Sequence, residues 1–188
     1  MKREDFKVFK CIPTLTTERL TLRKIQKFDL EDVFEYTSDT AVSEFLLWYP
    51  HKNREETDCY LNYLQKLYKK GKFYDWGIEI GGKMIGTAGF SKINIKDNSA
   101  EIGYVLNRSF WGKGIAVEAI EEIVKFGFSV LKLDKISAVI ISENKRSAKV
   151  LSKCNFKEEK SEEKKMQIKG ALRSISRFSI SRELYLYE

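Results

Sequence analysis

A chain of 188 residues is long enough for one domain with a buried core, and 43% hydrophobic with 32% charged residues is an ordinary globular composition. No segment approaches the ~20 apolar residues of a membrane span, and the N-terminus lacks the continuous apolar stretch of a secretory signal. Cys11, Cys59 and Cys154 show neither metal-ligand nor redox-pair spacing, so we expect free thiols in a cytoplasmic protein and no bound metal. The net charge of +7 favours an anionic partner, such as nucleic acid, a ribosome surface or a phosphorylated cofactor.

The first predicted elements are a strand and two helices. Apolar and polar residues alternate in a strand that ends near Lys27. Asp29 is then expected to cap a short helix. Asn53 and Glu56 have the spacing of a capping box, which begins a longer helix that ends at Gly71.

An aromatic segment separates these two helices. It reads SEFLLWYPHKN over residues 43–53, and Pro50 argues against a strand there. We therefore predict a loop on the substrate side, with Trp48 and Tyr49 as candidate contacts for the substrate.

The middle of the chain predicts a meander of three strands followed by a helix. Alternation over residues 76–80, a glycine turn and a return over 84–93 indicate a β-hairpin. A third strand is expected over 99–106. A helix over 115–131 has one apolar stripe, with Glu118 on the face that we expect to be exposed to water.

The last predicted elements complete one domain over residues 1–188. They are a strand over 135–142, a helix over 145–153, and strands around 156–165 and 172–187. This order predicts an α+β fold with one central sheet, mixed but mostly antiparallel, of about seven strands flanked by about four helices.

The junction between the strand at 99–106 and the helix at 115 carries the chemistry. Gly112 and Gly114 lie between them. A helix N-terminus offers free N–H groups and partial positive charge, and glycine lets a bulky anion approach the backbone. The spacings of a P-loop and of a dinucleotide fingerprint are absent. The pattern alone suits a phosphate site and a tight strand–helix turn equally.

The flanking residues resemble the GNAT superfamily of N-acetyltransferases, whose diphosphate-binding loop reads Arg or Gln, two residues, Gly, one residue, then Gly or Ala. FWGKGIA is a close version. With TERLTLR, AEIGYVL and ENKRSAKVLSKCNF, the likeness covers nearly the whole chain and is similar to the RimJ/RimL-type branch. Ser109 stands where the motif has Arg or Gln, so one side-chain contact to the phosphates is lost or is made instead by Arg108 or Lys113. Asn155 replaces a usual glycine, which is mild because asparagine tolerates left-handed geometry.

The resemblance implies acetyl-CoA as co-substrate and a GNAT-like fold. The strand segment 102–105 would pair with the pantetheine arm like an added strand, and its divergence from the strand at 135–142 would open a slot. The residues implied in coenzyme binding are Ile102, Tyr104, Val105, Arg108, Trp111, Gly112, Lys113, Gly114, Ile115, Ala116, Asn144 and Ser147.

Acetyl transfer by direct attack needs a base for the amine. Glu101, in the strand before the glycine loop, is the first candidate, with Glu44 and His51 as alternatives. A lone strand carboxylate is also typical of a solvent-facing position.

The reaction also needs oxyanion donors and a proton for the leaving thiolate. A backbone N–H of segment 102–105 is expected to stabilise the oxyanion, with Tyr104 beside the reacting groups. Leu151 stands where many members have a tyrosine acid. Ser147 is therefore the candidate donor to the sulfur, although Asn144 and Ser147 also suit helix caps.

The resemblance suggests the α-amine at the N-terminus of a ribosomal or other protein as acceptor. Polyamines, aminoglycosides and amino acids share the scaffold. A CoA-binding protein without catalysis and a nucleic-acid-binding module remain alternatives. The latter is based on Lys164, Lys165, Arg173, Arg177 and Arg182, but direct nucleic-acid binding is not expected because no such motif is present. A homodimer is compatible with the sequence, which does not fix the oligomeric state.

Overall fold

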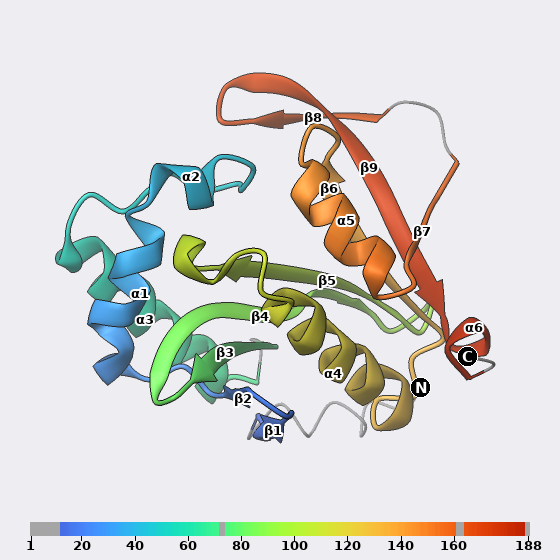
Figure 1. Cartoon of the computed structure of the whole chain (residues 1–188), viewed down its shortest axis with the longest axis horizontal. Coiled ribbons are helices and arrows are strands. Elements are labelled where there is room, and N and C mark those ends of the chain that lie inside the picture. The colour runs from blue at the N-terminus through green and yellow to red at the C-terminus, as the bar shows by residue number, and fades with distance from the viewer. Residues whose placement is uncertain (1–11, 72–73, 161–163, 187–188) are drawn as a thin grey trace.

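The computed structural model describes residues 12–71, 74–160 and 164–186. They form one nine-stranded sheet in the order β1-β2-β3-β4-β5-β6-β9-β7, with β8 paired to β9 (Figure 1). The strands are β1 (Leu15–Thr16), β2 (Thr21–Arg23), β3 (Asp75–Ile80), β4 (Lys83–Asn94), β5 (Ser99–Leu106), β6 (Lys135–Ile141), β7 (Lys157–Glu158), β8 (Lys164–Ile168) and β9 (Ala171–Ser181).

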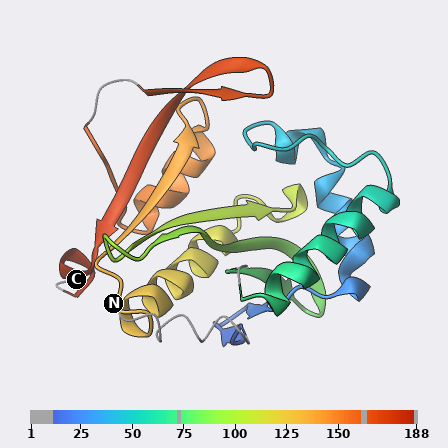
Figure 2. The same ribbon diagram turned by 180° about the vertical axis from the view of Figure 1, so that it is seen from behind.

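Helices cover both faces of this sheet. Helices α4 and α5 lie on one face, and α1 and α3 lie on the other, as the two opposite views show (Figures 1 and 2). None of the helices in the described ranges combines the length and apolar character that a membrane span requires. The helices are α1 (Leu30–Thr37), α2 (Thr40–Ser43), α3 (Arg54–Lys69), α4 (Ile115–Ser129), α5 (Lys145–Lys153) and α6 (Arg182–Leu186), with 3-10 turns η2 (Lys27–Asp29) and η3 (Arg108–Phe110).

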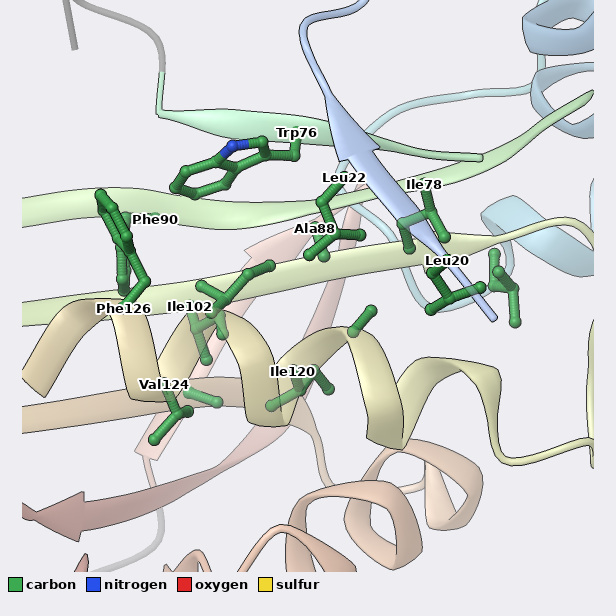
Figure 3. Packing of buried hydrophobic residues seen from close by; sticks show 14 of the residues in the cluster. Leu20, Leu22, Trp76, Ile78, Ala88, Phe90, Ile102, Ile120, Val124 and Phe126 are labelled. Atoms are coloured by element: carbon green, nitrogen blue, oxygen red, sulfur yellow. The ribbon is translucent and has the colours of Figure 1, made fainter. Parts of the chain in front are cut away.

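The core is an aromatic and aliphatic layer between the sheet and α4. The Trp76 ring packs edge-on against Phe90 and Phe126, with ring centroids 6.3 Å and 5.4 Å away. Ile102 on β5 and Ile120 on α4 fill the same layer (Figure 3). Because this layer is close-packed, it fixes where α4 begins relative to the end of β5.

Strands β5 and β6 diverge, as the resemblance led us to expect. They pair in parallel only at Ser99–Lys135, Ala100–Ile136 and Glu101–Ser137, whereas β5 continues to Leu106. The other strand pairs in the described sheet are antiparallel. The divergence leaves the second half of β5 with a free edge on the side of β6.

The predicted fold class is confirmed, but several elements differ from the expectation. The strand expected over 156–165 is split into β7 and β8, and the strand expected over 172–187 ends at Ser181, where α6 follows. Strand β1 and helix α2 were not predicted because two and four residues are too short to show a period. Helix α4 ends at Ser129, two residues earlier than expected.

The expected cap by Asp29 is wrong for a tertiary reason. Its carboxylate makes no capping bond to α1; it accepts from the Arg23 guanidinium at 2.7 and 2.9 Å and from the Gln26 N–H at 2.6 Å. The guanidinium contacts both carboxylate oxygens, and such a two-point pair between opposite charges is among the stronger hydrogen-bond arrangements, so it determines the orientation of Asp29.

The first predicted strand, β2, ends at Arg23 and not near Lys27, where the 3-10 turn η2 begins. The cap of α3 and the geometry of Asn155 hold with one change. The Asn53 side chain caps α3 by accepting from the Glu56 N–H at 3.0 Å. Glu56 accepts from the Lys52 N–H at 2.8 Å instead of closing the capping box on Asn53. Asn155 has the expected left-handed backbone, with φ of 61°.

Candidate active site

A cavity of about 350 Å³ lies beside the start of α4. It is walled by α2 and the loop after it, the second half of β5, the glycine loop, the first turn of α4, and α5. The lining residues are Ala41, Val42, Phe45, Leu46, Tyr104, Val105, Leu106, Phe110, Trp111, Gly112, Gly114, Ile115, Ala116, Val117, Asn144, Arg146, Ser147, Lys149, Val150 and Lys153.

The glycine loop has the geometry of an anion site. Gly112 and Gly114 have φ of 76° and 78°, which side chains other than glycine rarely adopt. A Cβ built at Gly112 meets no atom within 4 Å, so the space in front of the loop is open. The first helical bond of α4 runs from Glu118 N–H to Gly114 C=O, so the three preceding amides of the helix have no partner within it. A diphosphate fits this arrangement of donors.

A row of cations on α5 faces the same cavity. Arg146, Lys149 and Lys153 line it, and the Arg146 guanidinium carbon lies 4.1 Å from the centre of the Trp111 ring. None of the three was predicted as a site residue. Their spacing of three and four residues places them on one helix face, a signal that the sequence contains.

Tyr104 of β5 and Ser147 of α5 contact each other at the wall of the cavity. The Tyr104 hydroxyl donates to the Ser147 carbonyl at 3.3 Å. Burial raises the pKa of Tyr104, which keeps the hydroxyl protonated as a donor. The Ser147 N–H donates to the Asn144 side chain at 3.1 Å, so the expected cap of α5 is present, and both residues also line the cavity.

Some candidate residues lie away from this cavity. Ile102 is buried in the core beneath α4. Arg108 is exposed, and the Lys113 ammonium lies over the Phe110 ring at 5.2 Å. Neither of these two cations lines the cavity, so the structure does not place them as direct replacements for the side chain missing at Ser109.

The aromatic pair expected to contact the acceptor also lies outside the cavity. Trp48 packs on the His51 ring, with centroids 5.9 Å apart. Tyr49 is 66% exposed, and the Lys169 ammonium lies 5.3 Å from its ring centre. Lys169, in the β8–β9 turn, also donates to the Ser43 carbonyl at 2.6 Å, which joins the hairpin to α2.

Glu101 lies where β5 and β6 diverge. It is the last residue of β5 paired with β6, and strand alternation places its side chain on the face opposite to that of Ile102. Its carboxylate lies 3.5 Å from the Arg177 guanidinium, which also donates to the Ser137 hydroxyl at 3.1 Å. Glu101 is therefore beside the slot and outside the cavity.

The two alternative bases have other partners. Glu44 pairs with Arg146 at 3.6 Å. The His51 Nδ1 is 2.8 Å from the Thr57 hydroxyl, and burial lowers the pKa of His51. Neither residue lines the cavity.

Glu118 does not face water as expected. Its side chain is only 18% exposed and is held by Thr17 and Arg19. No sequence signal revealed this contact, because Arg19 precedes Glu118 by 99 residues. Within the described ranges, no three His, Cys, Asp or Glu side chains gather as they would around a metal ion.

Comparisons with known proteins identify the family of the chain. The acetyltransferase (GNAT) domain model matches residues 19–157. The uncharacterized N-acetyltransferase p20 of Bacillus licheniformis is 33% identical over 92% of this chain and 98% of its own length. The [ribosomal protein uS5]-alanine N-acetyltransferase of Escherichia coli is 26% identical over 77% of this chain and 78% of its own.

A solved relative shares the fold. The spermidine N-acetyltransferase of Vibrio cholerae, in complex with CoA and spermine, matches with a TM-score of 0.72 and 24% identity over 90% of this chain and 99% of its own. These relatives differ in acceptor, and the uS5 enzyme agrees with the resemblance to the RimJ/RimL-type branch. The chain belongs to the GNAT family of N-acetyltransferases, for which acetyl-CoA is the acetyl donor.

Proposed function

We propose that the chain transfers the acetyl group of acetyl-CoA to a primary amine by direct attack in the slot between β5 and β6. The divergence of these strands beside the open glycine loop is the observation that supports it. Beyond Glu101, no described strand pairs with β5 on the side of β6, so those backbone groups of residues 102–105 that point away from β4 are available to the pantetheine arm.

The residues around the slot supply the groups that the reaction needs. The amine nitrogen attacks the thioester carbon, and a backbone N–H of residues 102–105 stabilises the oxyanion. Glu101 takes the amine proton, directly or through a water molecule, from the face opposite to the cavity. The carbon–sulfur bond then breaks, and the Ser147 hydroxyl donates to the leaving sulfur.

The coenzyme is held mainly by backbone donors of residues 111–116. A helix N-terminus with free amides binds a diphosphate without any side chain. Arg146, Lys149 and Lys153 add positive charge along the same wall of the cavity. The loss of the usual side chain at Ser109 therefore leaves the main contacts in place.

Charge around the slot favours the α-amine of a protein N-terminus over a polyamine. Each of three carboxylates near the slot is paired with an arginine, and Lys169 adds one more cation beside α2. A polycation is attracted to a surface of net negative charge, and these pairs leave none, whereas a single amine needs less negative charge. The pairs are Glu101–Arg177 (3.5 Å), Glu44–Arg146 (3.6 Å) and Glu143–Arg173 (3.4 Å).

The same ion pairs weaken the case for nucleic-acid binding. Arg173 and Arg177 are two of the five basic residues that supported it, and a third, Arg182, is bonded to Asp134. A duplex binds through cations that are free to contact phosphates. Salt-sensitive binding of random duplex, with no affinity for acetyl-CoA, would favour nucleic-acid binding over acetyl transfer.

A cytoplasmic location remains part of the proposal. Cys59 and Cys154 are free thiols in the structure, which suits a reducing compartment. Fractionation of cells followed by immunodetection tests it, and recovery in an exported fraction would contradict it.

Release of free thiol from acetyl-CoA in the presence of an amine panel tests the function. The panel contains ribosomal-protein N-terminal peptides, spermidine, an aminoglycoside and amino acids. We expect thiol release with the peptides and little with spermidine. Thiol release with spermidine and not with the peptides would show that the acceptor is a polyamine and not a protein N-terminus. Coenzyme binding without thiol release in the presence of any of these amines would favour the non-catalytic alternative.

Two glycine variants give that assay a matched control. Gly112→Val places a side chain in front of the loop, whereas Gly81→Val places one in the β3–β4 turn. Both glycines have positive φ, and at neither does a Cβ meet an atom within 4 Å. We expect similar losses of stability but loss of CoA binding only in Gly112→Val. Equal calorimetric affinities would remove the glycine loop from the proposal.

A further inference from the structure

Arg19 is the side chain that holds the glycine loop from outside the cavity. It lies in the turn between β1 and β2, and its Nη1 donates to the Lys113 carbonyl at 3.0 Å. Its Nη2 is 3.5 Å from the position that a Cβ on Gly114 would occupy. A cation from the start of the chain thus contacts the middle of the loop.

This contact sets the direction of a backbone donor. In a trans peptide unit the C=O and N–H point in opposite directions. Because the Lys113 carbonyl is bonded to Arg19, the Gly114 N–H faces away from Arg19, and Gly114 lines the cavity. A loop without this bond would be free to turn the carbonyl, with its partial negative charge, toward an anion.

The second partner of Arg19 is a carboxylate in the first turn of α4. Glu118 accepts from Arg19 Nε at 2.7 Å, from the Arg19 N–H at 2.9 Å and from the Thr17 hydroxyl at 2.5 Å. Although burial acts to raise it, these bonds lower the pKa of Glu118 below its ordinary value. The carboxylate is therefore ionised at neutral pH, one helical turn from the amides of the glycine loop.

We infer that Arg19 is a positioning residue for diphosphate binding: it fixes the Lys113–Gly114 peptide and cancels the negative charge of Glu118. The inference rests on the proposed coenzyme site. Without Arg19, the negative charge of Glu118, one helical turn from the amides of the glycine loop, would repel a diphosphate bound there. Arg19 thus contributes to the grip on the coenzyme without touching it, and it does so where the motif side chain at Ser109 is missing.

Three variants and one control test this. Arg19→Gln removes both effects, Glu118→Gln removes the negative charge alone, and the double variant removes both partners. Arg54→Gln breaks an Arg–Glu pair between α3 and α1, remote from the loop, at a similar contact distance of 2.7 Å. Affinities for CoA and for dephospho-CoA are measured by calorimetry, and folding by the thermal unfolding midpoint.

Arg19→Gln is expected to weaken CoA and dephospho-CoA equally, by about tenfold. Equal loss is expected because both ligands carry the diphosphate. The double variant should recover part of the affinity, to within about threefold of the unmodified protein, because the repulsion is gone. Arg54→Gln should leave both affinities unchanged.

Several results would overturn the inference. They are unchanged CoA affinity in folded Arg19→Gln, a loss confined to CoA and absent with dephospho-CoA, and a double variant weaker than Arg19→Gln. A loss of CoA affinity of about tenfold in Glu118→Gln would also do so, because removing the negative charge should not weaken diphosphate binding. This arm needs only the unmodified protein for comparison, so it stands if Arg19→Gln does not fold. Failure of the unmodified protein to bind CoA would instead overturn the proposed function.

Discussion

The two ends of the sheet are built from different interactions. From β2 to β5, strands pair continuously and bury Trp76, Phe90 and Phe126 between the sheet and α4. Beyond Glu101, β5 parts from β6, which stays paired with β9, and ion pairs, cation–π contacts and a hydrogen bond join the β8–β9 hairpin, α2 and α5 to their neighbours. Apolar packing holds its geometry in all solvents and salts that keep the fold, whereas exposed polar contacts exchange readily. Substitutions in the first region should therefore change stability, and those in the second should change catalysis.

The largest expected effect is on the packed region. Trp76→Ala removes a fully buried ring whose Nε1 donates to the Pro13 carbonyl at 2.6 Å. We expect the free energy of unfolding to fall by about 3–5 kcal/mol, measured by urea denaturation. Trp48→Ala, which truncates the half-buried ring in the loop after α2 that packs on His51, should cost about 1 kcal/mol. Equal losses would erase the difference between the two regions.

The next effect concerns the base. Glu101→Gln keeps the size of the side chain but removes its ability to take a proton, so kcat should fall by about 100-fold with the fold intact. Arg177→Gln breaks the same ion pair while leaving the carboxylate, and it is the matched control. Similar kcat losses in both variants, measured with the acceptor found in the thiol-release assay, would assign the effect to the ion pair and not to a base.

Ser147→Ala should have a smaller catalytic effect. It removes the hydroxyl proposed to bond the leaving sulfur, but it keeps the N–H that Asn144 caps and the carbonyl that Tyr104 bonds. Loss of one hydrogen bond that forms with a developing thiolate predicts a fall in kcat of about tenfold, with little change in CoA affinity. Turnover equal to that of the unmodified enzyme would remove Ser147 from the mechanism.

The smallest effect is expected at the hairpin. Lys169→Met removes the bond to the Ser43 carbonyl and the contact with Tyr49. Because these contacts join two exposed segments, the acceptor KM should change by about threefold while CoA affinity is constant. Lys165→Met, which removes a cation from β8 itself, is the control. A change in CoA affinity for Lys169→Met would show that the hairpin contacts and the coenzyme site are not independent.

The sequence predicted the elements with a clear period, and it predicted fewer of the tertiary contacts. Helix α3 and strand β5 were expected within two residues of their bounds, because alternation and caps are local signals. The place of Asp29 was missed because Arg23, on β2, competes for its carboxylate. Glu118 was missed because its partners come from the β1–β2 turn, and pairing at that separation leaves no trace in a periodic pattern.

The site was predictable to the same extent. The position of the glycine loop between a strand and a helix followed from local chemistry, whereas its assignment to a coenzyme and the divergence of β5 from β6 followed from the resemblance. The basic face of α5 was overlooked although Arg146, Lys149 and Lys153 have helical spacing. The base, by contrast, depends on which residues lie beside the slot, and the sequence made Glu101 the first candidate while leaving Glu44 and His51 as alternatives.

The bond between Lys169 and Ser43 has a consequence for how such enzymes diversify. It joins segments that are 126 residues apart in the chain, and neither segment supplies the glycine loop. We therefore expect substitutions in the β8–β9 hairpin or near Ser43 to alter the choice of amine while the glycine loop keeps its sequence. Under the proposed function, chains of this family could diverge in acceptor through changes in these two surface segments.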